Sequence, residues 1–228
     1  MRLFGAILVF AGCHADGMAA PDASPPPDAP AGTSLGMFVG WHANPALPGA
    51  LDDHLTVADA TFHIAAFEVI GDAGPGDSRT TRLKYAVAWD LAGTPVQEAF
   101  PDAPVGLYSK ITIDMAGASF GDFSYQIRGT YRDSGIVKPF WLVDYARLGA
   151  TIDCQQAVAA GSAVTIPLSF EAGDVLNSLD FRRLTPINGV LMFAGPLDPQ
   201  LPAFRARLAA SLKVEDDDDE PGAENEDE

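Results

Sequence analysis

Several segments of the chain alternate apolar and polar residues with a period of two, which is the pattern of a strand that buries one face. In the clearest segment, 82–91, nearly every second side chain is large and apolar. Clusters of turn-forming residues separate these segments. The expected strands are 36–42, 56–70, 82–91, 110–115, 123–132, 146–154 and 164–170. The pattern predicts an all-β protein, an antiparallel β-sandwich of the transthyretin or immunoglobulin type.

Helical spacing is expected only towards the end of the chain. Asp198 followed by Pro199 is typical of an N-cap and a first helical residue. The apolar residues that repeat on one face of this helix are Leu201, Phe204, Leu208 and Leu212. A shorter helical turn is expected at 174–179. The longer helix is expected to close one side of the sandwich.

The first thirteen residues follow the order of an export signal. Arg2 precedes a short apolar run at 3–10, which ends in Ala11-Gly12-Cys13. This ending resembles the lipobox of bacterial lipoproteins, although Phe10 stands where Leu is usual. The alternative is a buried N-terminal strand that contains a cysteine. We predict a signal peptide at 1–12 and lipidation of Cys13, which would anchor the protein stably in a membrane.

Composition divides the remaining chain into a folded part and two polar flanks. A Pro- and Ala-rich tether is expected at 13–34, a domain with a C-terminal helix at 35–213, and a disordered acidic tail at 214–228. The formal net charge is -17, and about -7 remains without the ten acidic residues at the end. This charge argues against a nucleic-acid partner. No apolar run of about 20 residues is present, so no permanent membrane-spanning helix is expected.

Three stretches carry a family resemblance: 61–68 (TFHIAAFE), 104–111 (PVGLYSKI) and 176–181 (LNSLDF). Together they resemble uncharacterised β-sandwich lipoproteins that are abundant in myxobacteria and their relatives. The resemblance covers about 35–212 and implies the fold and the envelope location, but no activity. A fainter similarity, through the strand pattern and the Pro-x-Gly-x-Tyr turn, is to copper-associated periplasmic proteins encoded beside methanobactin genes. Those proteins are usually richer in cysteine.

Three histidines, His42, His54 and His63, are the candidate metal ligands of the folded part. Imidazole nitrogen suits copper, and neighbouring strands could bring the three residues together. Their spacing does not require this, because His63 is expected within a strand and a loop-like stretch separates His42 from His54. Three unrelated histidines are the alternative.

Other candidate residues have structural explanations. Cys154 shares its alternation with Ile152 and Ala150, so a buried thiol is expected there. Gly117-Ala118-Ser119-Phe120-Gly121 matches a nucleophile elbow in its letters, but a strand and not a helix is expected after it. The aromatic residues that could stack on a glycan are Trp41, Trp89, Tyr108, Tyr125, Tyr131, Phe140, Trp141 and Tyr145. Most of them fit the alternation as core.

These observations predict a noncatalytic binding or structural module of the cell envelope, lipid-anchored, with the outer membrane favoured. Its partners would be the membrane, through the lipid, and a glycan or protein ligand. The alternative function is a periplasmic copper-binding protein that uses His42, His54 and His63. No other cofactor is expected.

Overall fold

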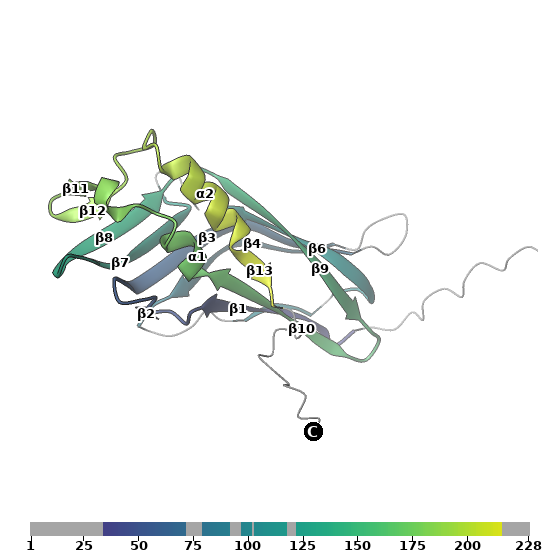
Figure 1. Cartoon of the computed structure of the whole chain (residues 1–228). Coiled ribbons are helices and arrows are strands. Elements are labelled where there is room, and N and C mark those ends of the chain that lie inside the picture. Colours follow the sequence, from purple (N-terminus) through teal and green to yellow (C-terminus); the bar gives the residue numbers. More distant parts are fainter. Residues whose placement is uncertain (1–33, 72–78, 92–96, 102, 118–121, 216–228) are drawn as a thin grey trace, which may run out of the picture. The chain divides into compact units, whose positions relative to one another are not determined.

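The computed structural model describes residues 34–71, 79–91, 97–101, 103–117 and 122–215, and for 79–84 it describes the backbone (Figure 1). The predicted signal peptide with Cys13, nearly all of the predicted tether, Ser119 and most of the predicted acidic tail lie outside the described residues. Within them the structure consists mainly of strands with few helices. The predicted all-β class is confirmed.

A small sheet joins strands from both ends of the described chain, in the order β13–β10–β1–β5. Its strands are β1 (Gly36–Asn44), β5 (Glu98–Phe100), β10 (Ala163–Glu171) and β13 (Leu212–Val214). β1 and β10 run parallel along nine paired positions, from Gly36 beside Ala163 to Asn44 beside Glu171. The described sheets are therefore mixed, although most of their strand pairs are antiparallel as expected. Period-two alternation says which face a strand buries, but it carries no information about the direction of the neighbouring strand.

A larger sheet has the order β11–β12–β8–β7–β3–β6–β9, and β2 and β4 also pair with β3. Its strands are β2 (Gly49–Ala50), β3 (Leu55–Gly71), β4 (Arg79–Trp89), β6 (Gly106–Met115), β7 (Tyr125–Asp133), β8 (Ile136–Asp144), β9 (Leu148–Val158), β11 (Thr185–Ile187) and β12 (Val190–Met192). Its pairs are antiparallel except β12 with β8. Sequence reasoning missed β8, because Lys138-Pro139 interrupts its alternation.

Besides β2 and β4, the long strand β3 pairs with two strands in succession, first β7 and then β6. Its first half pairs with β7 between Leu55 and Phe62, and its second half pairs with β6 between Ile64 and Gly71. His63 lies where the partner changes: its amide donates to the Ser124 carbonyl at 2.8 Å, and its carbonyl accepts from the Ala116 amide at 3.0 Å. β7 and β6 thus diverge from β3 at this residue.

Aromatic rings from both sheets pack into one core. Phe170 of β10 lies 4.9 Å from Phe62 of β3, and Trp41 of β1 lies 6.0 Å from Phe67 of β3, as centroid distances with edge-to-face geometry. Trp89 of β4 contacts both Trp41 and Phe170. Each such pair contributes about 0.5–1.5 kcal/mol beyond the burial of its surface. The cluster therefore holds the two sheets against each other.

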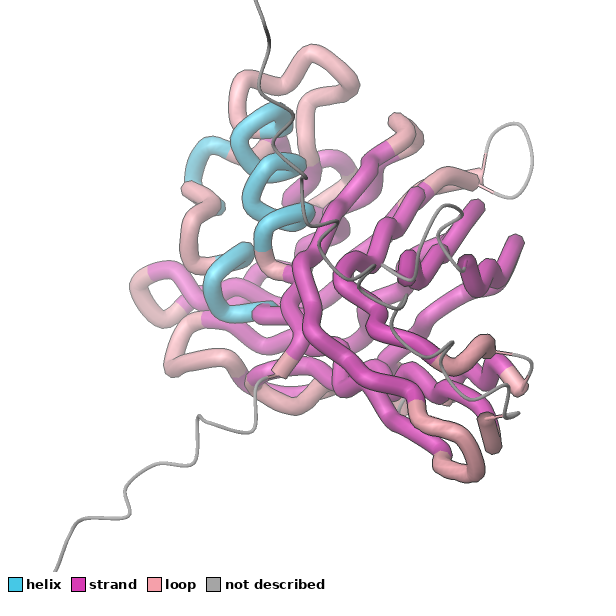
Figure 2. Tube along the Cα trace, turned by 90° about the vertical axis from the view of Figure 1, so that its right-hand side faces the viewer, coloured by secondary structure: helices cyan, strands magenta, loops and turns pink. Residues whose placement is uncertain are grey.

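Two short helices lie together beside the strands (Figure 2). They are α1 (Ala172–Leu176) and α2 (Leu201–Ala210), and a 3₁₀ turn, η1 (Phe181–Arg183), lies between them in sequence. α2 begins three residues after Asp198, so Asp198 is not its N-cap. Asp198 instead accepts from the Ala194 and Gln200 amides, at 2.8 and 2.9 Å, and folds the loop before the helix. Leu212, expected on the helix, lies in β13. None of the helices described here is long and apolar enough to cross a membrane.

A buried ion pair and its pocket

Asp144 is the last residue of β8 and is only 6% exposed. The chain leaves the sheet here for a short turn to β9. The Asp144 carboxylate folds back on this turn, and its Oδ1 accepts from the amides of Tyr145 at 2.8 Å and Ala146 at 3.1 Å. Such local bonds from an aspartate to its own turn suit the end of a strand.

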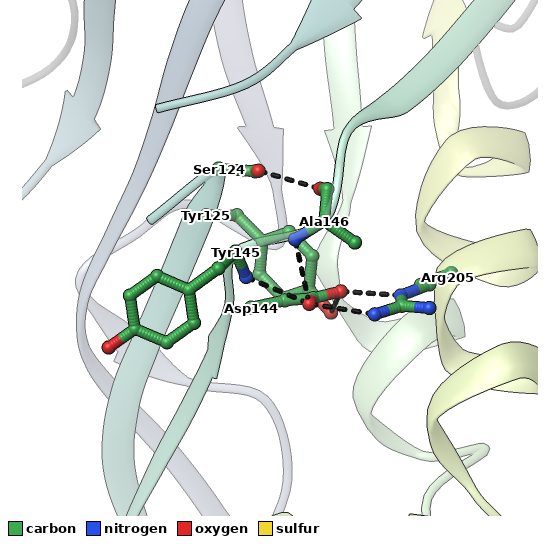
Figure 3. Close-up of polar contacts among 6 residues, drawn as sticks. All are labelled: Ser124, Tyr125, Asp144, Tyr145, Ala146 and Arg205. Atoms are coloured by element: carbon green, nitrogen blue, oxygen red, sulfur yellow. Dashed lines mark hydrogen bonds and ion pairs between the residues drawn. The ribbon is translucent and has the colours of Figure 1, made fainter. Parts of the chain in front are cut away.

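Ser124 ties the same turn to the start of β7. Its side chain is fully buried, and its Oγ donates to the Ala146 carbonyl at 2.6 Å. Its amide donates to the Asp144 carbonyl at 2.7 Å. The turn is therefore fixed from both sides (Figure 3).

Arg205 reaches the Asp144 carboxylate from α2, which brings together residues 61 positions apart. Its Nε donates to Oδ2 at 2.5 Å and its Nη2 donates to Oδ1 at 2.8 Å, so the pair is bidentate (Figure 3). The hydroxyl of buried Tyr125 also donates to Oδ2, at 3.3 Å. Both carboxylate oxygens thus have several donors, which offsets the cost of burying the charge.

The electrostatics follow from these contacts. Burial alone would raise the pKa of Asp144, but the hydrogen bonds from Arg205 and from the turn amides outweigh it and hold that pKa below its ordinary value. The hydrogen bond to Asp144 raises the pKa of Arg205. Burial, followed by the nearby Asp144 charge, raises the pKa of Tyr125, so its hydroxyl stays a donor. At neutral pH, Asp144 is therefore an anion and Arg205 is a cation.

A pocket of about 380 Å³ lies next to this ion pair. Its residues come from the end of β8, the turn after it, the end of β12 with the segment that follows, and the first half of α2. They are Val143, Asp144, Tyr145, Ala146, Met192, Phe193, Gly195, Pro196, Leu201 and Arg205. Most are apolar, and the volume is within the range of small-molecule sites.

The loop that forms one wall of the pocket is fixed by its own contacts. Besides the two bonds that Asp198 accepts, the Asp198 amide donates to the Gly195 carbonyl at 3.0 Å. Gly195 has a φ of +128°, a conformation that side chains oppose and glycine allows. Gln200 links this loop to Asp180, with its amide nitrogen donating to the Asp180 carbonyl and its oxygen accepting from the Asp180 amide. The wall is therefore largely preformed.

Arg205 keeps hydrogen-bonding capacity beyond its bond to Asp144. The Nη1 nitrogen lies on the side of the guanidinium away from the carboxylate (Figure 3). It makes no hydrogen bond to any residue that the structure describes, and the side chain is 27% exposed. This is the one cationic side chain in the described lining of the pocket.

The three predicted metal ligands lie on different elements. His42 is exposed on β1 of the small sheet. His54 lies in the loop before β3, with its Nδ1 3.2 Å from the Arg132 carbonyl, and it lines a separate polar pocket of about 330 Å³. His63 lies within β3, nine residues further on, or roughly 30 Å along an extended strand. Its ring stacks on Phe123, and its Nδ1 lies 2.8 Å from the Phe123 carbonyl.

Among the described residues, no group of three or more His, Cys, Asp or Glu is placed to hold a metal ion. The shared copper site stays a prediction that this arrangement does not support. His42 lies on the exposed side of β1 in the small sheet, whereas His54 and His63 lie just before and within β3 of the larger sheet, nine residues apart.

The remaining sequence candidates lie mainly in the core. Cys154 is 8% exposed and buried with Ala150 and Ile152, as its alternation predicted. The fully or nearly fully buried members of the aromatic set are Trp41, Trp89, Tyr108, Tyr125 and Phe140. Tyr145 is 60% exposed and lines the Asp144 pocket, although its ring points away from the ion pair (Figure 3).

Sequence reasoning missed Asp144 and Arg205 as a site. A single aspartate at the end of an apolar strand and one of two arginines on a helix carry no spacing that links them. A weak signal existed in Phe140, Leu142 and Asp144, which share one face of β8 and would place a carboxylate on the buried side.

A comparison with protein-family models, curated proteins and solved structures finds no match to the chain.

Proposed function

We propose that this protein is a noncatalytic binding module of the cell envelope, and that its binding site is the pocket beside Asp144 and Arg205. The observation that carries the proposal is the combination of an apolar pocket with a half-buried guanidinium that keeps free donors. Sites for small ligands have this composition, apolar walls with few placed polar groups.

The hydrogen bonds that Asp144 already accepts favour a binding function over a catalytic one. Asp144 already accepts five hydrogen bonds, and its low pKa makes it a poor proton acceptor near neutral pH. A general base needs a free lone pair within reach of the proton that it removes. The described lining holds no serine, cysteine or histidine. The geometry therefore suits a rigid receptor.

A fragment screen by protein-observed NMR tests the binding function. The expected result is a set of fragments that shift the signals of Met192, Phe193 and Arg205. Met192→Trp should fill the pocket and abolish these shifts, whereas Ile187→Trp, on the exposed and neighbouring β11, should keep them. Matched thermal midpoints would show that both variants fold. Fragments that bind only elsewhere, or none at all, would remove the pocket as the binding site.

The envelope location rests on Ala11-Gly12-Cys13 and on the tether composition after it. In this proposal Cys13 carries the lipid and the tether holds the domain away from the membrane. Labelling with radioactive palmitate should mark the wild type and the Cys154→Ala control, but not Cys13→Ala. Equal labelling of the Cys13→Ala variant, or an unlabelled wild type, would contradict the anchor.

We also interpret the two sheets as the layers of a β-sandwich, the transthyretin- or immunoglobulin-like form expected from the sequence. The ring contacts between β10 and β3 and between β1 and β3 support this interpretation. The parallel β1–β10 pair argues for a variant of that topology, since those sandwiches are mainly antiparallel.

A further inference from the structure

We propose that the pocket selects an uncharged, mostly apolar molecule through one carbonyl-type oxygen, which accepts a hydrogen bond from Nη1 of Arg205. This inference rests on the proposed binding function and adds the class of ligand to it. Three features of the site carry it: the size and walls of the pocket, the free donors of Arg205, and the charge already present.

The walls set the size and the character of the ligand. Val143, Met192, Phe193, Pro196 and Leu201 supply apolar surface. A volume of about 380 Å³ corresponds to roughly a dozen non-hydrogen atoms, at about 30 Å³ for a water-sized group. Such walls cannot satisfy several polar groups of a ligand, and each unpaired polar group would weaken binding. A compact molecule with one polar end fits best.

The hydrogen-bonding pattern sets the polarity of that end. Arg205 has five N–H groups, and two of them bond to Asp144. Nη1 and the second hydrogen on Nη2 are donors, so they require an acceptor. The Asp144 oxygens are occupied by Arg205, Tyr125 and the turn amides and offer little to a ligand donor. A ketone, ester or amide oxygen matches this end of the pocket.

The charge balance favours a neutral acceptor over an anion. Asp144 already neutralises Arg205, so a ligand carboxylate on Nη1 would put two negative charges around one guanidinium. In a half-buried site such an excess charge is costly. The chain is also acidic, with a formal net charge of about -7 even without the ten acidic residues at its end, which opposes the approach of anions. A neutral oxygen receives a charge-assisted bond without this cost.

Three probes of nearly equal shape separate these possibilities. They are 4-phenylbutan-2-one, which ends in a ketone, 3-phenylpropanoate, in which a carboxylate oxygen replaces the methyl group, and the hydrocarbon 3-methylbutylbenzene. Binding is followed by protein-observed NMR on the full chain. The ketone should bind about tenfold more tightly than the hydrocarbon, because it alone gains the bond to a charged donor without adding charge. It should also bind more tightly than the carboxylate, and it should shift the Arg205 Nε–H signal.

The pocket is identified with the variants used above. Met192→Trp should abolish ketone binding and Ile187→Trp should not. If Met192→Trp does not fold, the positions of the shifted signals in the wild type decide the site. A ketone that shifts signals only outside this pocket overturns the inference.

Each other outcome also overturns the inference and bears differently on the proposed function. Tighter binding of the carboxylate makes the pocket an anion site, and equal binding of ketone and hydrocarbon makes Arg205 irrelevant to selection. In both cases the binding function stands. If none of the probes binds but the fragment screen yields ligands in this pocket, the ligand class alone is wrong. If neither yields pocket binding, both proposals fall.

Discussion

Two Asp–Arg pairs in this protein share their bonding pattern but not their surroundings. Arg205 binds Asp144, and Arg147 binds Asp114. In each pair the arginine Nε and Nη2 donate hydrogen bonds to the two carboxylate oxygens. In the first pair the carboxylate and the guanidinium side chains are 6% and 27% exposed, and in the second they are 20% and 75% exposed. Similar contacts therefore lie in very different dielectric environments.

The comparison shows that the contribution of an ion pair to the stability of the fold depends on its surroundings. Asp144 also accepts from Tyr125 and from the turn amides, so the pair connects α2, β7 and the turn between β8 and β9. Asp114 and Arg147 connect β6 to the residue before β9, strands that already share a ladder of backbone bonds. Removing the first pair would remove a polar link between a helix and the sheet, whereas removing the second would leave the backbone ladder of its strands in place.

The largest expected effect comes from Arg205→Leu. This change leaves the Asp144 charge buried without its cation, which costs about 3–5 kcal/mol of unfolding free energy. Urea denaturation measures the loss. Arg207→Leu, an exposed position on the same helix, is the matched control and should have little effect. Equal losses in both variants would show that the helix, and not the ion pair, is responsible.

Asp144→Asn should have a smaller effect. Asparagine keeps an oxygen that can accept from the Tyr145 and Ala146 amides, but it removes the charge that Arg205 requires. We expect a loss of about 1–3 kcal/mol in unfolding free energy near pH 7. Asp114→Asn is the control at the exposed pair. If both variants lost the same amount, burial would not distinguish the two pairs.

Acid should remove the difference between the wild type and Asp144→Asn. The folded-state pKa of Asp144 lies below the ordinary value of about 3.9, because the bonds from Arg205 and the turn amides outweigh the effect of burial. Its stabilisation is therefore complete above the unfolded-state pKa and is lost as the pH falls through the folded-state pKa. Denaturation between pH 7 and pH 2.5 measures this convergence. A constant difference across that range would contradict the assignment.

The smallest effect is expected for Arg147→Gln. The Arg147 side chain is exposed, so water and salt screen its charge, and holding two side chains together costs entropy. The urea midpoint should stay within the error of the measurement, and any difference should vanish at 1 M salt. A midpoint shift comparable to that of Arg205→Leu would invalidate the comparison.

Much of the fold could be predicted from local patterns. The strands near 36–42, 56–70 and 164–170 were found because alternation of apolar residues is a local property. Cys154 was placed on the buried side for the same reason. The boundaries of α2 were less accurate, because Asp198 bonds to the Ala194 amide, four residues before it, as well as to the Gln200 amide after it. Strand β8 was missed where lysine and proline interrupt the pattern.

The candidate site could not be predicted in the same way. Asp144 and Arg205 lie 61 residues apart, and the pocket adds a segment after β12 that belongs to neither element. The histidines illustrate the converse: their spacing permitted a shared site, but the structure places His42 on the exposed side of β1 and the other two at separate positions, just before and within β3. A local sequence pattern does not determine the distance in space between two residues that lie far apart in the chain.

The sequence by itself determined the all-β class, the faces that the strands bury and the chemical character of the two flanks, because each of these depends on neighbouring residues. Only the tertiary structure decided that β1 runs parallel to β10, that β3 divides its partners at His63, and that Arg205 meets Asp144. These outcomes depend on how all strands pack at once. The physical reason is that side-chain periodicity fixes which face is buried, whereas contacts between distant segments are selected by the packing of the whole core.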